Sequence, residues 1–153
     1  MSRFKLQHHF TALQPLFALG KQLDAGTLEP VLRDLVLMRV SQINGCAYCL
    51  DMHSKDVRAA GESEQRLYVL PAWREAPFYS ARERAALAWA EALTQLAAHD
   101  QSVPDALYEE ARAQFDEKEL VDLTLLVTLI NSWNRINIAG QPEVGGYKPG
   151  MFK

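Results

Sequence analysis

Both cysteines of the chain lie in one short stretch, residues 41–53, together with one of its four histidines. Cys46 and Cys49 form a CxxC motif, and His53 follows four residues after Cys49. On a helix, at about 100° per residue, the three side chains fall within roughly 60° of one another around the axis. One helical face would therefore present two thiols and an imidazole, which are groups suited to thiol redox chemistry or to metal binding.

The residues before the motif predict where its helix begins. Asn44-Gly45 is a turn signal, so we expect Cys46 at or near a helix N-terminus. Unpaired N–H groups and the positive end of the helix dipole favour a thiolate there. By position alone, Cys46 would be the more acidic of the two thiols.

Three interpretations of this stretch remain open on spacing alone. The first is a redox dithiol, with His53 as base or proton shuttle. The second is a zinc site, although Cys46, Cys49 and His53 would need a fourth ligand for a closed site, and the other histidines are distant in sequence. The third is purely structural, with two small buried residues and a helix histidine. The in-phase histidine favours redox chemistry.

The composition is that of an ordinary globular protein. The chain has 153 residues, of which 48% are hydrophobic and 23% charged, and we expect one domain over residues 1–153. Lys and Arg number 16 against 19 Asp and Glu, a net charge of −3. That balance does not indicate a nucleic acid or membrane-surface partner, and no apolar run reaches the ~20 residues of a membrane span.

The cysteine usage indicates a reducing compartment. No apolar stretch of the signal-peptide kind follows the first charged residues. A lone CxxC in such a chain points to the cytoplasm, where the pair is expected to be catalytic or metal-binding rather than a static disulfide.

The hydrophobic pattern predicts an all-α protein, since no stretch alternates apolar and polar residues for long. Ser80 with Glu83 is a capping box, and Asp116 with Glu119 is a second capping signal. Glu91 is the polar exception on an apolar face and is expected to be a structural hydrogen-bond partner. The expected helices cover residues 10–23, 27–42, 46–60, 63–70, 81–98, 104–115 and 117–138, with a connector at 99–102 and a glycine-rich loop tail at 140–153.

Asp34 lies on the helix expected just before the cysteine helix. Two helices joined by a short turn can face each other, so its carboxylate could reach His53. The residues alone favour the other interpretation, a solvated surface acid.

Residues 37–53, with 59–62, 82–87, 91–94 and 131–135, resemble the alkylhydroperoxidase D (AhpD-like) family of the carboxymuconolactone decarboxylase superfamily. The resemblance covers roughly residues 27–138. It implies an all-α bundle of about six to seven helices, with the CxxC at the N-terminus of a core helix. It also implies homo-oligomers, commonly trimers or hexamers.

The activity that the resemblance implies is a thiol-dependent peroxidase for antioxidant defence, with no metal or organic cofactor. Cys49 would attack the peroxide, Cys46 would resolve the product as a disulfide, and an external thiol system would reduce it. His53 and Asp34 would form the proton relay. His53 lies one turn from Cys49, which supports Cys49 as the attacking thiol against the helix-dipole argument for Cys46.

Two positions depart from the family pattern. Asp34 stands where the family has a glutamate, so the carboxylate is one methylene shorter. Tyr48 stands before the second cysteine, where a histidine is frequent. Alternatives to the peroxidase are a non-catalytic redox switch or binding protein and a metal-binding module. A decarboxylase is less expected, because that branch of the superfamily lacks the CxxC pair.

Overall fold

The computed structural model describes residues 2–98 and 103–151, and every regular element within them is helical. The prediction of an all-α fold is confirmed. The predicted connector at 99–102, with His99, lies outside the described residues. The α-helices are α1 (Phe10–Asp24), α2 (Pro30–Asn44), α3 (Ala47–Ala59), α4 (Glu64–Tyr68), α5 (Ala81–Thr94), α6 (Asp105–Arg112) and α7 (Glu117–Gly140), and 3-10 turns cover Leu6–His9, Leu70–Ala72 and Leu96–Ala98.

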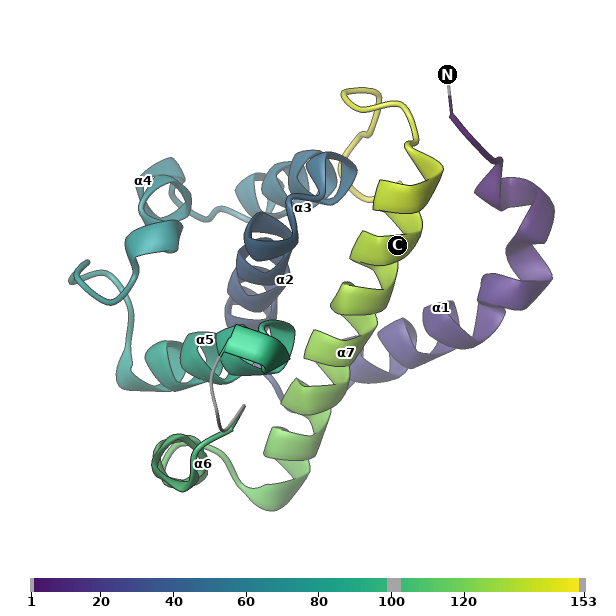
Figure 1. Cartoon of the computed structure of the whole chain (residues 1–153). Helices are drawn as coiled ribbons and strands as arrows, with labels where there is room; N and C mark the ends of the chain where they lie inside the picture. The colour runs from purple at the N-terminus through teal and green to yellow at the C-terminus, as the bar shows by residue number, and fades with distance from the viewer. Residues whose placement is uncertain (1, 99–102, 152–153) are drawn as a thin grey trace.

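Helix α2 is the centre of the arrangement and packs against α3, α5 and α7 (Figure 1). Residues on two different faces of α2 belong to two separate hydrophobic clusters. Leu32, Val36 and Val40 recur at helical spacing and join the larger cluster with α5 and α7. Leu35 and Met38 lie on another face and join the smaller cluster with α3, α4 and the following turn. A helix anchored on both sides fixes the position of the turn that carries the CxxC.

Both predicted capping boxes are present. The Glu83 N–H donates to Ser80 Oγ at 3.2 Å, and the Ser80 N–H donates to Glu83 Oε2 at 2.7 Å. Asp116 and Glu119 make the same reciprocal pair at the start of α7. A capping side chain stabilises a helix by about 1 kcal/mol, so these residues define where α5 and α7 begin.

Helix α5 is shorter than the sequence predicts. It ends at Thr94 rather than near Ala98, and a 3-10 turn follows. The Thr94 hydroxyl donates to the Ala90 carbonyl at 2.7 Å and accepts from Asn131 of α7 at 3.1 Å. The end of α5 is thus attached to α7, whereas the alanine-rich sequence gives no local stop signal.

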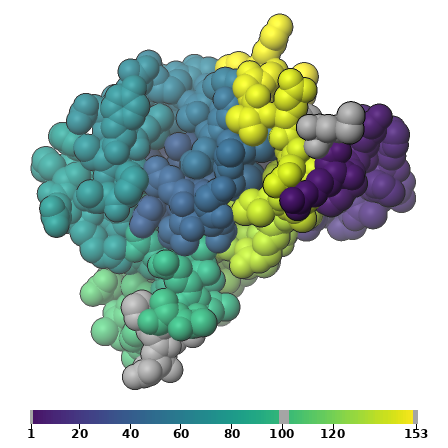
Figure 2. Space-filling model, turned by 45° about the horizontal axis from the view of Figure 1, so that its top comes forward, coloured from purple at the N-terminus to yellow at the C-terminus, as the bar shows by residue number. Residues whose placement is uncertain are grey.

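The N-terminal part of the chain forms a lobe beside α7 (Figure 2). Phe17 of α1 packs on Trp133 with ring centroids 4.9 Å apart. Leu23 is the only fully buried residue of α1, and Phe10 is 57% exposed. Helix α1 therefore carries more apolar surface than this chain covers.

The glycine-rich tail is ordered along α3. Lys55 donates to the carbonyls of Gly145 and Tyr147 at 3.0 and 3.1 Å. Asp56 accepts from the Tyr147 hydroxyl at 2.8 Å and from the Gly150 N–H at 3.0 Å. The predicted loop tail begins one residue later than expected, because Gly140 is still the last residue of α7, and residues 141–151 contain no helix or strand. In the part of the chain that the structure describes, no helix has the length and apolar character needed to cross a membrane.

Candidate functional site

The CxxC lies at the junction of α2 and α3. Gly45 ends α2 in the left-handed conformation, with φ of 67°, which favours glycine because it has no Cβ. The Cys46 N–H then donates to the Ser41 carbonyl at 3.1 Å, and Cys46 becomes the N-cap of α3. The prediction that the CxxC opens a core helix is confirmed.

The two cysteines are joined in a disulfide, with their Cα atoms 5.3 Å apart. Each residue is only 1% exposed. The Cys49 N–H donates to Cys46 Sγ at 3.3 Å, which satisfies one of the free N–H groups of the first turn of α3. The site is therefore a buried disulfide, with one sulfur at a helix N-terminus.

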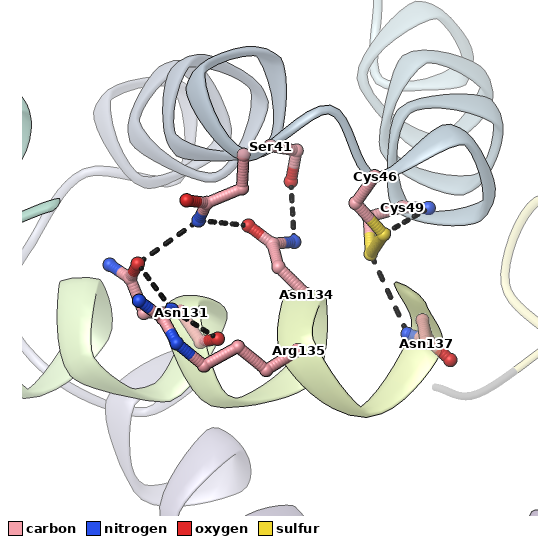
Figure 3. Close-up of a disulfide and its surroundings, with 8 residues drawn as sticks. Ser41, Cys46, Cys49, Asn131, Asn134, Arg135 and Asn137 are labelled. Atoms are coloured by element: carbon pink, nitrogen blue, oxygen red, sulfur yellow. Dashed lines mark hydrogen bonds between the residues drawn. A yellow bond between two sulfur atoms is a disulfide. The ribbon is translucent and has the colours of Figure 1, made fainter. Parts of the chain in front are cut away.

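Helix α7 supplies a direct contact to the second sulfur. Asn137 Nδ2 donates to Cys49 Sγ over 3.5 Å (Figure 3), and Asn137 is 7% exposed. Asn137 is not among the site residues predicted from the sequence. A signal was available, because Asn131, Asn134 and Asn137 recur every three residues on a helix rich in leucine, valine and isoleucine.

The same face of α7 holds the turn before the cysteines. Asn134 is fully buried and donates to Ser41 Oγ at 3.0 Å. Asn44 Nδ2 donates to Asn134 Oδ1 at 2.9 Å and to Asn131 Oδ1 at 3.0 Å (Figure 3). The buried amide of Asn134 and the half-buried amides of Asn44 and Asn131 are paired with one another, and this fixes the end of α2 against α7.

His53 lies one turn after Cys49 on α3 and is half-buried. Burial lowers the pKa of His53 to about 4, while the nearby Asp56 carboxylate acts in the opposite direction. The imidazole is therefore neutral at pH 7 and can accept a proton. His53 is a weak base toward a thiol, because its imidazolium has a pKa of about 4 whereas an ordinary thiol has a pKa near 8.5.

Asp34 and Tyr48 complete the set of residues singled out from the sequence. Asp34 is half-buried on α2, one turn before Met38. Helix α2 packs against α3, which carries His53, and the relay from Asp34 to His53 stays a prediction. Tyr48 is half-buried, and burial together with Asp51 raises its pKa, so it is a neutral phenol at pH 7.

Glu91 has the structural role expected of it. Its carboxylate accepts from Arg39 at 2.7 Å, from Trp73 Nε1 at 2.9 Å and from Arg74 at 2.5 Å. Burial alone would raise the pKa of Glu91, but these three donors outweigh burial and lower it. The ionised carboxylate joins α2, α5 and the turn after α4.

The described residues contain no cluster of metal-binding side chains that would support the metal interpretation. Across residues 2–98 and 103–151, no group of three or more His, Cys, Asp or Glu side chains is arranged to hold a metal ion.

The sequence matches the model of the carboxymuconolactone decarboxylase family over residues 11–92, more than half of the 153 residues. The chain belongs to this family. The curated protein YdfG of Bacillus subtilis (strain 168), which is uncharacterised, is 52% identical over 107 residues, covering 70% of this chain and 71% of YdfG.

Solved structures of the family share the fold. A protein of unknown function from Agrobacterium tumefaciens, for which a role as the antioxidant defence protein AhpD has been suggested, is 35% identical. It superimposes with a TM-score of 0.89 over 96% of this chain and 100% of its own. An uncharacterised peroxidase-related protein from Silicibacter sp. TM1040 is 27% identical, with a TM-score of 0.77 over 92% of this chain and 74% of its own. The predicted AhpD-like resemblance is confirmed.

Proposed function

We propose that this member of the carboxymuconolactone decarboxylase family is a thiol-dependent peroxidase that reduces hydroperoxides in antioxidant defence. The observation that carries the proposal is the buried Cys46–Cys49 pair, with His53 one turn from Cys49. Two thiols in bonding distance can be oxidised and reduced in a cycle, and a neutral imidazole can move the proton that the cycle requires. The names of the Agrobacterium and Silicibacter neighbours agree with this class of activity.

The first step oxidises Cys49. His53, oriented by Asp34, takes the proton of the Cys49 thiol, and the thiolate attacks the terminal oxygen of the hydroperoxide. The O–O bond breaks, Cys49 becomes a sulfenic acid, and the leaving alkoxide takes the proton to become an alcohol. The thiol sulfur is oxidised by two electrons and the peroxide is reduced by two.

The second step forms the disulfide. The Cys46 sulfur attacks the Cys49 sulfenic acid, an S–S bond forms, and the hydroxyl leaves as water with the Cys46 proton. Two equivalents of an external thiol then restore both cysteines by exchange and become a disulfide themselves. The cycle uses only sulfur, imidazole and carboxylate groups, with no metal or organic cofactor, and we place it in the cytoplasm, where thiols are kept reduced.

Peroxide consumption with excess dithiol tests the proposal. The wild type should turn over continuously, and Cys49→Ser should lose all activity because the attacking sulfur is gone. In the absence of added thiol, Cys46→Ser should stop after one sulfenic acid per chain, detected by mass after trapping with dimedone. A wild type that forms one disulfide and consumes no further peroxide would contradict the enzyme proposal.

The relay has its own test in Asp34→Asn, which keeps size and removes the charge. We expect peroxidase turnover to fall about tenfold to a hundredfold, since general base assistance is worth about 10²–10⁴ in rate and the thiolate still forms without it. Asp24→Asn, an exposed acid at the end of α1, is the matched control and should have wild-type turnover. Equal rates for Asp34→Asn and wild type would remove Asp34 from the mechanism.

A redox switch is the second candidate, and the contacts between α3 and the tail favour it. The helix that carries Cys49 also binds the tail through Asp51, which accepts from the Gly145 N–H at 3.2 Å, and through Lys55 and Asp56. Reduction of the disulfide at one end of α3 could change how the tail is held. This candidate requires one oxidation per chain without turnover.

We propose further that copies of this chain assemble into a homo-oligomer. The uncovered apolar surface of α1 supports this, as do Val121 and Ile138 of α7, which are 52% and 43% exposed. Isolated apolar residues on a surface are common, but several on neighbouring helices are typical of an interface.

A further inference from the structure

The contact between Asn137 and Cys49 is not used in the mechanism above. It joins α7 to α3 across 88 residues of sequence, and it places the amide N–H of a buried side chain 3.5 Å from the reacting sulfur. Both residues are buried, Asn137 at 7% and Cys49 at 1% exposure. A buried donor next to a sulfur acts most strongly on the ionised form, because a thiolate in a dry site has no water to solvate it.

The two sulfurs of the pair have different donors. Cys46 Sγ accepts the backbone N–H of Cys49 at 3.3 Å, at the N-terminus of α3. Cys49 Sγ accepts from the Asn137 side chain. The helix terminus stabilises a thiolate at Cys46, so a reactive Cys49 needs a stabilising group of its own.

His53 supplies only part of what Cys49 needs. Its neutral imidazole can receive the proton, but burial makes the imidazolium unfavourable. The cation nearest to His53 in sequence on α3 is Lys55, whose ammonium is paired with Asp51 at 2.9 Å and donates to two carbonyls of the tail. The other ionisable groups are the phenol of Tyr48, the Asp56 carboxylate with its partner Tyr147, and Asp34 on the packed helix α2, and none of these is a cation at pH 7. The neutral amide of Asn137 donates to a thiolate without itself having to ionise.

Asn137 is also held in place. Asn134 and Asn131, three and six residues before it on α7, accept hydrogen bonds from Asn44 at the end of α2, and Asn134 donates to Ser41 (Figure 3). These bonds fix α7 against the same turn that positions Cys46 and Cys49. A donor fixed before the reaction stabilises developing charge without reorganisation.

We propose that Asn137 is a catalytic residue that selects Cys49 over Cys46 as the reactive thiolate, by donating its side-chain N–H to the Cys49 sulfur. The role in peroxide reduction rests on the proposed function, while the selection of the thiolate can be measured without peroxide.

The experiment uses the reduced full-length chain in the Cys46→Ser background, so that Cys49 is the one thiol that titrates. Absorbance at 240 nm and the rate of alkylation by iodoacetamide are followed against pH. Asn137→Leu has nearly the same size and no donor, and we expect it to raise the pKa of Cys49 by about one unit, the effect of one hydrogen bond to an ionised group. Alkylation at pH 7 should slow about tenfold and approach the parent rate at high pH.

Thr128→Val is the control, because it removes a polar group from an exposed position of the same helix, where the Thr128 hydroxyl donates to the Thr124 carbonyl and takes no part in the network around the cysteines. It should leave the pKa of Cys49 unchanged. If Asn137→Leu fails to fold, Asn137→Asp replaces it, since an isosteric carboxylate beside the sulfur should raise the Cys49 pKa further. With both cysteines present, one equivalent of iodoacetamide should label Cys49 in the wild type and shift toward Cys46 in the Asn137 variants.

The outcomes separate this proposal from the peroxidase. A Cys49 pKa and labelling pattern unchanged by substitution of Asn137 would overturn the selection role, even if the wild type consumes peroxide. A raised pKa with labelling shifted to Cys46 would support the role, even if the wild type proves to be a switch without turnover.

Discussion

Replacing Glu91 by alanine is expected to lower the free energy of unfolding by about 3 kcal/mol, the cost typical of breaking a buried ion pair on one side. Glu91 is 8% exposed, and its carboxylate is the shared acceptor of three donors. Its removal leaves the guanidinium of Arg39 and the indole N–H of Trp73 in the interior without their partner. An unpaired buried donor costs more than the hydrogen bond itself contributed.

Glu91→Gln separates charge from hydrogen bonding. The glutamine keeps one acceptor oxygen, loses the charge and presents an N–H to one of its former donors. We expect a loss of about half that of Glu91→Ala, measured by urea unfolding with the disulfide intact in both. Glu75→Ala, at an exposed position close in sequence to Trp73, should stay within about 0.5 kcal/mol of wild type. A loss below about 1 kcal/mol for Glu91→Ala would show that the network adds little to stability.

Local signals in the sequence were enough to predict most of the fold. The helix ends at Ser80, Asp116 and Gly45 are each determined by residues no more than four positions away, and such local causes can be found in the sequence. The end of α5 at Thr94 could not be found this way, because no local stop signal precedes it and the hydrogen bond that Thr94 accepts comes from Asn131, 37 residues away. A helix end that is held by a contact with a distant helix leaves no signal in the residues around it.

The candidate site also combines residues that local spacing predicts with residues that only the packing of helices brings together. Cys46, Cys49 and His53 lie on one helix, so their spacing alone placed them together. Asn137 reaches Cys49 from α7, and its part in the site follows only from the packing of α7 against α3. The low pKa of His53 was equally hidden from the sequence, since burial depends on what covers the residue.

That low pKa predicts acid sensitivity of the fold. An imidazole in the unfolded chain takes its proton near pH 6.5, and His53 in the folded chain takes it only near pH 4. Between these values the unfolded chain binds more protons, so the free energy of unfolding falls as the pH is lowered from about 6.5 to 4. The gap of about 2.5 pH units corresponds to a loss of about 3 kcal/mol, complete below pH 4.

Urea unfolding between pH 7 and pH 4, on the oxidised protein so that no thiol titrates, measures this effect. His53→Gln removes the titrating group and should lose about 3 kcal/mol less over that range than the wild type. His8→Gln, at an exposed position of the N-terminal segment, should follow the wild type. Parallel curves of unfolding free energy against pH for His53→Gln and wild type would mean that the folded chain does not lower the pKa of His53. Because His53 in the folded chain stays neutral until the pH approaches 4, peroxide turnover should show no titration of this group near pH 6.5.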